Sequence, residues 1–241
     1  MRTFNKIFVI ALPRCATATM SDALGILGIR TAHLGKIYQE PGNEHNNPKR
    51  LIRIHEQLAE GDDRLDILDI CDGLADYPVC CLPIIKRVDQ AYPGSLFINV
   101  LRSTDMNKWL QSVERQFVGL QLLKQGANST PLERAFMEVM LSFRSMTFGD
   151  AKFCPERYAR VYASYQQDVN AYFSGRTGDL LTLDLEELEE VGFERLSEFL
   201  QCPAPEGKRF PRSNAHSTLP TRAFFTALQR GEISSLTGLS P

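Results

Sequence analysis

Small residues, hydroxyls and one arginine are concentrated in a single segment, Ala11-Leu-Pro-Arg-Cys-Ala-Thr-Ala-Thr-Met20. A loop of small residues lets successive backbone N–H groups close around an anion, and a following helix adds free N–H groups and its positive dipole end. Thr17 and Thr19 contribute hydroxyls, and Arg14 contributes a permanent charge with forked donors. These residue types predict a site for an anionic ligand. A helix cap and packing turn, with Arg14 in solvent, is the purely structural alternative.

Two common nucleotide-binding patterns are absent from this segment. It lacks Gly-x-x-x-x-Gly-Lys-Ser/Thr, so it is not a Walker loop for ATP or GTP, and it lacks the Gly-x-Gly-x-x-Gly of dinucleotide-binding folds. Cys81 and Arg87 have the spacing of a cysteine phosphatase loop. Pro83 removes a backbone donor there and two isoleucines crowd the segment, which argues against thiolate chemistry.

The elements around the segment must hold it in place. Residues 6–12 form a short continuous apolar run, typical of a strand buried on both faces. Helical spacing follows from Thr17 to a stop at Gly28, and residues 29–34 favour a second strand. Strand, turn, helix and strand within about thirty residues have the size of a βαβ unit.

The remaining pattern alternates strands and helices. Buried strands are predicted over residues 95–101 and 179–184, and helices over 83–92, 107–124, 131–148, 155–173, 193–200 and 220–229, with one more from the polar loop 41–50 to about 58. The stretch 62–76 is acidic and mixed, with no clear element. This alternation predicts one domain over residues 1–241, an α/β fold built as a three-layer α/β/α sandwich with a central parallel sheet. The tail from about residue 203 is expected to be flexible.

Composition limits the classes of partner. The 241 residues are 43% apolar and 23% charged with a net charge of −2, so we expect no general attraction to nucleic acid or to an anionic membrane. No segment approaches the ~20 apolar residues that cross a bilayer. The six cysteines show no paired-ligand spacing, which predicts reduced thiols and no metal site. We therefore expect a soluble, cytoplasmic protein whose oligomeric state the sequence leaves open.

At this point the residues resemble a known family, the sulfotransferases that use the donor PAPS (3′-phosphoadenosine 5′-phosphosulfate). The loop resembles their 5′-phosphosulfate loop, usually Pro-(Lys/Arg)-Ser/Thr-Gly-Thr-Thr, through Pro13-Arg14-Cys15-Ala16-Thr17-Ala18-Thr19. The segment Ala91-Tyr-Pro-Gly-Ser-Leu-Phe-Ile-Asn-Val-Leu-Arg102 is similar to their strand that ends in a 3′-phosphate-binding arginine. Trp109-Leu-Gln-Ser112 resembles the motif that follows it, whose serine contacts the same phosphate.

The likeness continues to Phe210-Pro-Arg-Ser-Asn214 and spans nearly the whole chain in order, as in single-domain bacterial-type members. It implies a fold like that of P-loop NTPases. Three departures stand out. Ala16 replaces the usual Gly and Ala18 a Thr, so the loop loses backbone freedom and one hydroxyl. Arg102 and Ser112 stand further apart than is usual, so Ser103 or Thr104 could contact the phosphate instead. The usual Asp after the arginine is missing.

The resemblance implies in-line transfer of a sulfuryl group, without a metal, from PAPS to a hydroxyl or amine of an acceptor, with PAP (the desulfated donor) as product. Arg14 would stabilise the bridging oxygen and the 5′-phosphate, Thr17 and Thr19 would orient phosphate oxygens, and Arg102 would select the 3′-phosphate. Arg209 and Arg212 near the C-terminus could fold over that phosphate, although a solvated basic loop is equally consistent. The acceptor would be a small molecule or a glycan.

The acceptor has to lose a proton, so a base is needed. His33 is the first candidate, because it ends the second predicted strand near the same sheet edge as the loop. Asp76 is the second, with a turn cap before Pro78 as its structural alternative. Glu40, His45 and His55 are weaker candidates. Two other functions stay open: a P-loop small-molecule kinase, and a non-catalytic nucleotide-binding relative suggested by Ala16 and Ala18.

Overall fold

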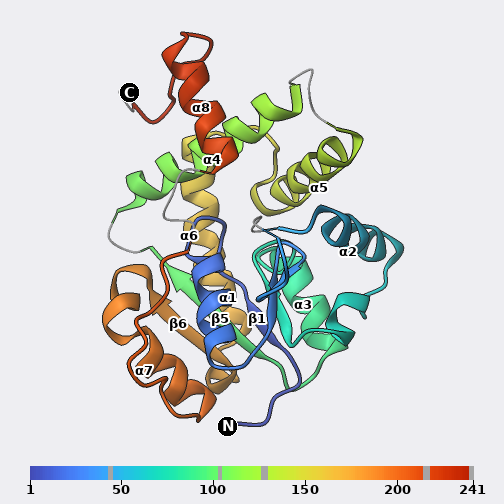
Figure 1. Ribbon diagram of the computed structural model, residues 1–241, viewed down its shortest axis with the longest axis vertical. Coiled ribbons are helices and arrows are strands. Elements are labelled where there is room, and N and C mark those ends of the chain that lie inside the picture. The colour runs from blue at the N-terminus through green and yellow to red at the C-terminus, as the bar shows by residue number, and fades with distance from the viewer. Residues whose placement is uncertain (43–45, 103–104, 126–129, 214–217, 239–241) are drawn as a thin grey trace.

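A mixed sheet forms the centre of the computed structural model, which describes residues 1–42, 46–102, 105–125, 130–213 and 218–238 (Figure 1). Its strands are β1 (Ile7–Val9), β2 (Thr31–His33), β3 (Lys36–Ile37), β4 (Gly73–Ala75), β5 (Leu96–Leu101) and β6 (Leu180–Asp184). They lie in the order β3-β2-β4-β1-β5-β6. Every neighbouring pair is parallel except β2 with β3. The predicted α/β class with a largely parallel central sheet is confirmed.

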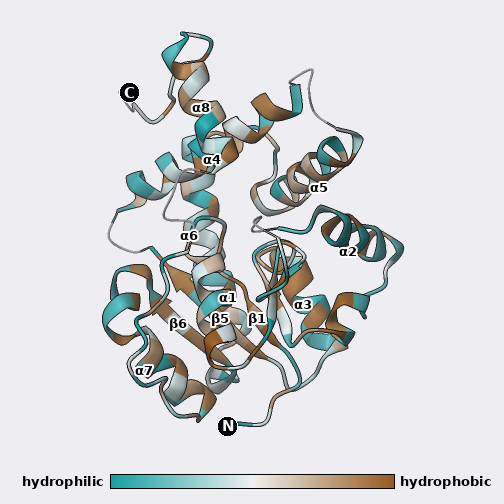
Figure 2. Cartoon of the chain, viewed as in Figure 1, coloured by the Kyte–Doolittle hydropathy of each residue, from teal (hydrophilic) through white to brown (hydrophobic). Residues whose placement is uncertain are grey.

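Helices cover both faces and the upper end of this sheet. They are α1 (Thr17–Ile26), α2 (Pro48–Glu60), α3 (Leu82–Ala91), α4 (Met106–Gln125), α5 (Pro131–Phe148), α6 (Pro155–Tyr172), α7 (Leu188–Leu200) and α8 (Leu219–Gln229). In Figure 1, α1 and α7 lie in front of the strands and α6 passes behind them, whereas α4, α5 and α8 lie beyond the sheet. The strands are coloured largely as hydrophobic in Figure 2, as expected for a sheet covered on both faces. None of the described helices has the length and apolar character needed to span a membrane.

The first predicted unit is present, with an insertion. The segments β1, α1 and β2 follow each other as expected, but β4 lies between β1 and β2 in the sheet. The residues 73–75 sit in the acidic stretch to which the sequence assigned no element. Gly73 is required there, because an added Cβ would lie only 1.7 Å from the carbonyl oxygen of Ile7 on β1.

Two expectations need correction. The strand at 179–184 is not buried on both faces: β6 is the edge of the sheet, and burial alternates along it with Leu181 and Leu183 turned inward. The last helix before the tail starts at Leu188, earlier than the predicted 193. Gly192 obscured that start in the sequence, and its small size lets the ring of Phe210 pack directly on the helix.

Candidate active site

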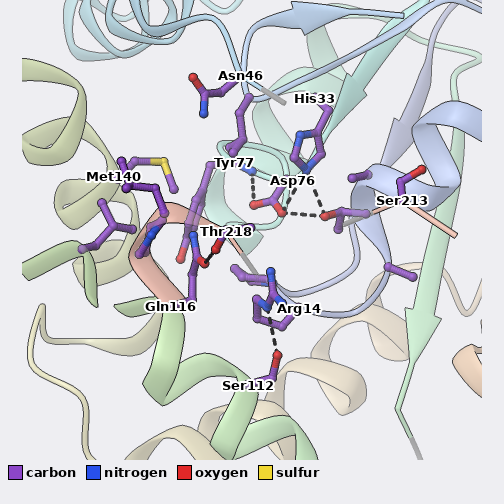
Figure 3. Close-up of a pocket in the computed structure, with 18 of the residues that line it drawn as sticks. Arg14, His33, Asn46, Asp76, Tyr77, Ser112, Gln116, Met140, Ser213 and Thr218 are labelled. Atoms are coloured by element: carbon purple, nitrogen blue, oxygen red, sulfur yellow. Dashed lines mark hydrogen bonds and ion pairs between the residues drawn. The ribbon is translucent and has the colours of Figure 1, made fainter. Parts of the chain in front are cut away.

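The carboxyl ends of four parallel strands bring the main candidates together, as open α/β sheets do for their ligands. Arg14 follows β1, His33 ends β2, Asp76 follows β4 and Arg102 follows β5. All four line one cavity of about 1360 Å³. Figure 3 shows His33 and Asp76 beside Arg14, with Ser213 on one side of the cavity and Met140 and Gln116 on the other.

Residues on the side away from the cavity hold the loop between β1 and α1 in place. The indole Nε1 of Trp109 on α4 donates to the carbonyl of Pro13 at 3.0 Å. Cys15 is fully buried, its N–H donates to the carbonyl of Leu12 at 3.1 Å, and burial raises the pKa of its thiol to about 12. Cys15 therefore supports the loop from the protein side, whereas Pro13, Arg14 and Ala16 to Thr19 face the cavity.

The N-terminus of α1 has no cap. Ala16 occupies the N-cap position with φ 56° and ψ 26°, in the left-handed region, and it has no side-chain acceptor. Nothing in the described part of the chain accepts a hydrogen bond from the amides of Thr17, Ala18 and Thr19. Uncapped amides at the positive end of a helix dipole are a physical fit for a phosphate or sulfate group.

Two guanidinium groups face the same space. The Nε of Arg14 donates to the hydroxyl of Ser112 on α4 at 2.9 Å, which fixes its direction. Burial lowers the pKa of Arg14, the carboxylate of Asp76 partly offsets this, and the Arg102 guanidinium lowers it further. The guanidinium of Arg102 has no hydrogen-bond or ion-pair partner among the described residues, and only its backbone N–H is held, by the Tyr162 hydroxyl at 2.8 Å. Two positive charges beside the uncapped N-terminus of α1 suit an anion that carries more than one negative charge.

A buried acid–base pair lies at the other side of Arg14. The ring Nε2 of His33 is 3.6 Å from Oδ2 of Asp76. The hydroxyl of Thr17 donates to the same Oδ2 at 2.6 Å and lies 3.3 Å from the His33 ring nitrogen. The register of β2 with β4 aligns His33 with Ala75, so the two side chains meet because their strands are neighbours. Thr17 thus contacts the pair in this structure, whereas the family resemblance implies that its hydroxyl orients phosphate oxygens.

The surroundings of Asp76 lower the pKa of its carboxyl. Burial by itself raises the pKa of its carboxyl, but the hydrogen bond and charge of His33, the Thr17 hydroxyl and the Tyr77 N–H together lower the pKa below its ordinary value. The Tyr77 N–H bonds Oδ1 at 2.8 Å, so Asp76 also has the turn-forming role considered for it. A carboxylate with a lowered pKa is a weak base and a good partner for a histidine that gains a proton.

The C-terminal segment closes the cavity beside α1. The Thr19 hydroxyl donates to the carbonyl of Ser213 at 3.3 Å, and the Ser213 N–H donates back to it at 3.2 Å. Arg212 lines the cavity and pairs with Glu189 on α7. Arg209 is exposed and does not line the cavity.

The other candidate residues either form contacts away from the cavity or lie outside the described residues. Glu40 pairs with Arg50 at 2.6 Å, and His55 bonds the Ser142 hydroxyl at 3.0 Å, so neither faces the cavity. His45, Ser103 and Thr104 lie outside the described residues. No group of three or more His, Cys, Asp or Glu residues that could hold a metal occurs in the described ranges.

Part of the cavity was not predicted. Its far side is lined by residues of α4, α5 and α8, among them Gln116, Met137 and Met140, and by Thr218, the N-cap residue of α8. Their helical spacing predicted the helices but carried no signal for a cavity. Ser213 belongs to the segment 210–214 that resembles a family motif, and that resemblance was its only signal.

The chain is similar to two solved structures and matches one family model. Among solved structures, the chain is similar to a sulfotransferase from Alicyclobacillus acidocaldarius, with 15% identity, a TM-score of 0.47, and coverage of 96% of this chain and 93% of that one. It is also similar to a sulfotransferase domain from the curacin biosynthetic pathway, with 14% identity, a TM-score of 0.47, and coverage of 94% and 91%. A comparison with curated proteins gives no significant match. A family model described as a sulfotransferase domain matches residues 6–219, which is most of the chain, and the protein therefore belongs to the sulfotransferase family.

Proposed function

We propose that the protein transfers a sulfuryl group from PAPS to the hydroxyl of an acceptor. The observation that carries this proposal is the convergence of two guanidinium groups and an uncapped helix N-terminus on one cavity, next to a buried histidine–aspartate pair. The first set suits the phosphate groups of the donor, and the second suits removal of a proton. The cavity of about 1360 Å³ also exceeds the ~300–1,000 Å³ of a pocket for one ligand, which fits a donor and an acceptor side by side.

The donor side is assigned from the loop outward. The amides of Thr17, Ala18 and Thr19 and the Arg14 guanidinium would hold the 5′-phosphosulfate, and Arg102 would hold the 3′-phosphate. When bound, PAPS supplies the sulfuryl group that is transferred. Ser112 holds Arg14 toward the loop, at a hydrogen-bond distance of 2.9 Å. Fixed donors of this kind stabilise charge that develops on the leaving phosphate without reorganisation during the reaction.

His33 is the proposed base, and Asp76 is its positioning partner. His33 accepts the hydroxyl proton as the acceptor oxygen forms its bond to sulfur. Arg14 and the loop amides stabilise the phosphate oxygen that leaves with the electron pair of the broken S–O bond. Asp76 then faces an imidazolium at 3.6 Å, which its carboxylate stabilises. This division of roles follows from the lowered pKa of Asp76, since a weakly basic carboxylate is better suited to pairing than to proton removal.

The altered loop residues favour an enzyme over a non-catalytic relative. Ala16 takes up the left-handed conformation that glycine adopts without penalty, so the loop backbone keeps a path that suits the residue usual in the family. Ala18 leaves its backbone N–H available to a ligand. The hydroxyl lost at Ala18 is one donor of several.

Titration of PAP by calorimetry, without added metal, tests the proposal. We expect Arg14→Ala and Arg102→Ala each to weaken binding by roughly tenfold or more, equivalent to about 1.4 kcal/mol. Arg53→Ala is the matched control, because Arg53 forms an exposed ion pair with Asp66 on the outer side of α2. Transfer of label from ³⁵S-labelled PAPS to added alcohols then tests the reaction. Folded wild-type protein that does not bind PAP contradicts the proposal, as does equal binding by all three variants.

A further inference from the structure

The cavity continues away from His33 and Asp76 between α4 and α5. We name this extension the distal arm and define it by six apolar side chains: Phe117, Leu120, Leu123, Phe136, Met137 and Met140. On α4 the three residues that define the arm recur every three positions, and on α5 the three lie three or four positions apart or are adjacent, so each helix turns an apolar stripe toward the arm. The distal arm is therefore lined by the apolar faces of two neighbouring helices, α4 and α5.

Polarity changes in one direction along the arm. Glu133 in the first turn of α5 is exposed, and its carboxylate is held by the Thr130 N–H at 2.7 Å and hydroxyl at 2.8 Å. Phe136 is half-buried, and Met137 and Met140 are only 5% and 6% exposed. The seven helical steps from Glu133 to Met140 span about 10 Å at the ~1.5 Å rise per residue of a helix. The arm thus runs from a charged outer end to an apolar inner end.

The polar side chains of Thr218 and Gln116 lie beside the arm and bond each other. The Thr218 hydroxyl donates to the side-chain oxygen of Gln116 at 2.9 Å (Figure 3). A sugar placed in the arm would bury several hydroxyls beside methionine, leucine and phenylalanine side chains. A buried polar group without a partner loses the hydrogen bonds that it makes with water. An apolar body costs nothing of this kind and gains from burial.

We propose that the acceptor is an alcohol or phenol whose hydroxyl is attached to an apolar body about 10 Å long. The hydroxyl lies toward His33, the body lies along Met140, Met137 and Phe136, and the far end of the body lies at the level of the exposed Glu133. The unbranched methionine side chains adapt to the shape of the body. This inference rests on the proposed function and narrows its acceptor, and it disfavours a glycan.

Binding of n-butanol, n-hexanol, n-octanol and glucose to the whole protein, with and without PAP, tests the inference. Each added methylene that enters the arm should tighten binding roughly fourfold. Glucose should bind far more weakly than n-octanol. Binding of glucose as tight as that of n-octanol, or no dependence on chain length, overturns the inference.

Matched variants locate the binding site. Met140→Gln places an amide in the arm and should weaken n-octanol binding roughly tenfold. Met146→Gln makes the same change on the same helix at a side chain that is 46% exposed, and it should leave binding unchanged. A second pair repeats the comparison near the outer end, where a polar side chain disturbs folding less. Phe136→Gln is the variant in the arm, and Leu132→Gln is its exposed control. Equal effects within both pairs contradict the assignment.

The two proposals fail in different ways. Chain-length-dependent alcohol binding that Met140→Gln weakens, without PAP binding, leaves the arm in place and removes the sulfotransferase reaction. PAP binding that depends on Arg14, without alcohol binding, supports the donor site and removes the apolar acceptor.

Discussion

Ala16→Gly should stabilise the protein, although it removes a side chain. Ala16 is the N-cap of α1 and has φ 56° and ψ 26°, a conformation in which its Cβ crowds the backbone. The left-handed conformation costs a residue other than glycine roughly 1–2 kcal/mol. Glycine removes this strain and keeps the loop path, and alanine has no capping group whose loss would oppose the gain.

The flexibility of glycine in the unfolded chain offsets part of this gain in stability. Glycine has more backbone freedom than alanine there, which favours the unfolded state by about 0.4–1 kcal/mol. Taking the middle of both ranges leaves a net stabilisation of about 0.8 kcal/mol. For a domain of this size, 1 kcal/mol corresponds to roughly 2–4 °C in Tm, so the expected rise in Tm is about 2 °C.

Ala18→Gly is the matched control for this prediction. Ala18 lies two positions further along, inside α1, where glycine costs about 0.5–1 kcal/mol relative to alanine. The same substitution is thus expected to raise Tm at one position and to lower it at the other, which differential scanning calorimetry can resolve. A fall in Tm for both variants would refute the argument that strain at residue 16 exceeds the entropy gained by glycine in the unfolded chain.

Three further predictions concern the His33–Asp76 pair and the packing of the C-terminal segment on α7. His33→Gln should lower kcat for sulfuryl transfer by about a hundredfold or more, and leave PAP affinity unchanged, in steady-state kinetics and calorimetry. Asp76→Asn should destabilise the protein at neutral pH. Because the folded pKa of Asp76 is lowered, the difference from wild type should shrink as pH falls below about 4 in urea titrations, and a difference that grows there would contradict the sign. Gly192→Ala should cost roughly 1–3 kcal/mol, because the new Cβ would lie 2.5 Å from the Phe210 ring, whereas Gly175→Ala meets nothing within 4 Å and should be neutral.

The sequence predicted the parts of the site that depend on local pattern. A short apolar run followed by small residues and a helix fixed the place of Arg14, and the strand before Arg102 was continuous and apolar. Both patterns arise within a dozen residues and need no knowledge of the rest of the chain. The helices at 131–148 and 155–173 were equally clear, since their apolar spacing and the proline at the start of each are local.

The missed features depend on neighbours in space. The three-residue β4 is too short for a pattern, and its Gly73 reads as a turn residue unless the nearby backbone of Ile7 is known. Without β4, nothing in the sequence states that His33 and Asp76 are adjacent, or that Thr17 reaches a carboxylate 59 residues away. Both residues were candidates as bases, but their pairing was not predicted.

The distal arm, which we propose sets the acceptor preference, also depends on contacts in space. Met137 and Met140 have the spacing of a helix that buries one face, and a core would account for that spacing equally well. Only the path of α4 relative to α5 leaves a cavity in front of them. Acceptor preference therefore could not be predicted from the pattern of the helix.

The bond between Thr19 and Ser213 has a consequence for synthesis. The two residues are 194 positions apart. At the ~5–20 residues per second of translation, the loop leaves the ribosome roughly 10–40 s before the segment that completes its wall. A nascent chain with a finished loop would still lack Ser213 beside α1 and Phe210 on α7. The earliest-made part of the site is thus among the last to be enclosed, and donor binding should be acquired late in translation.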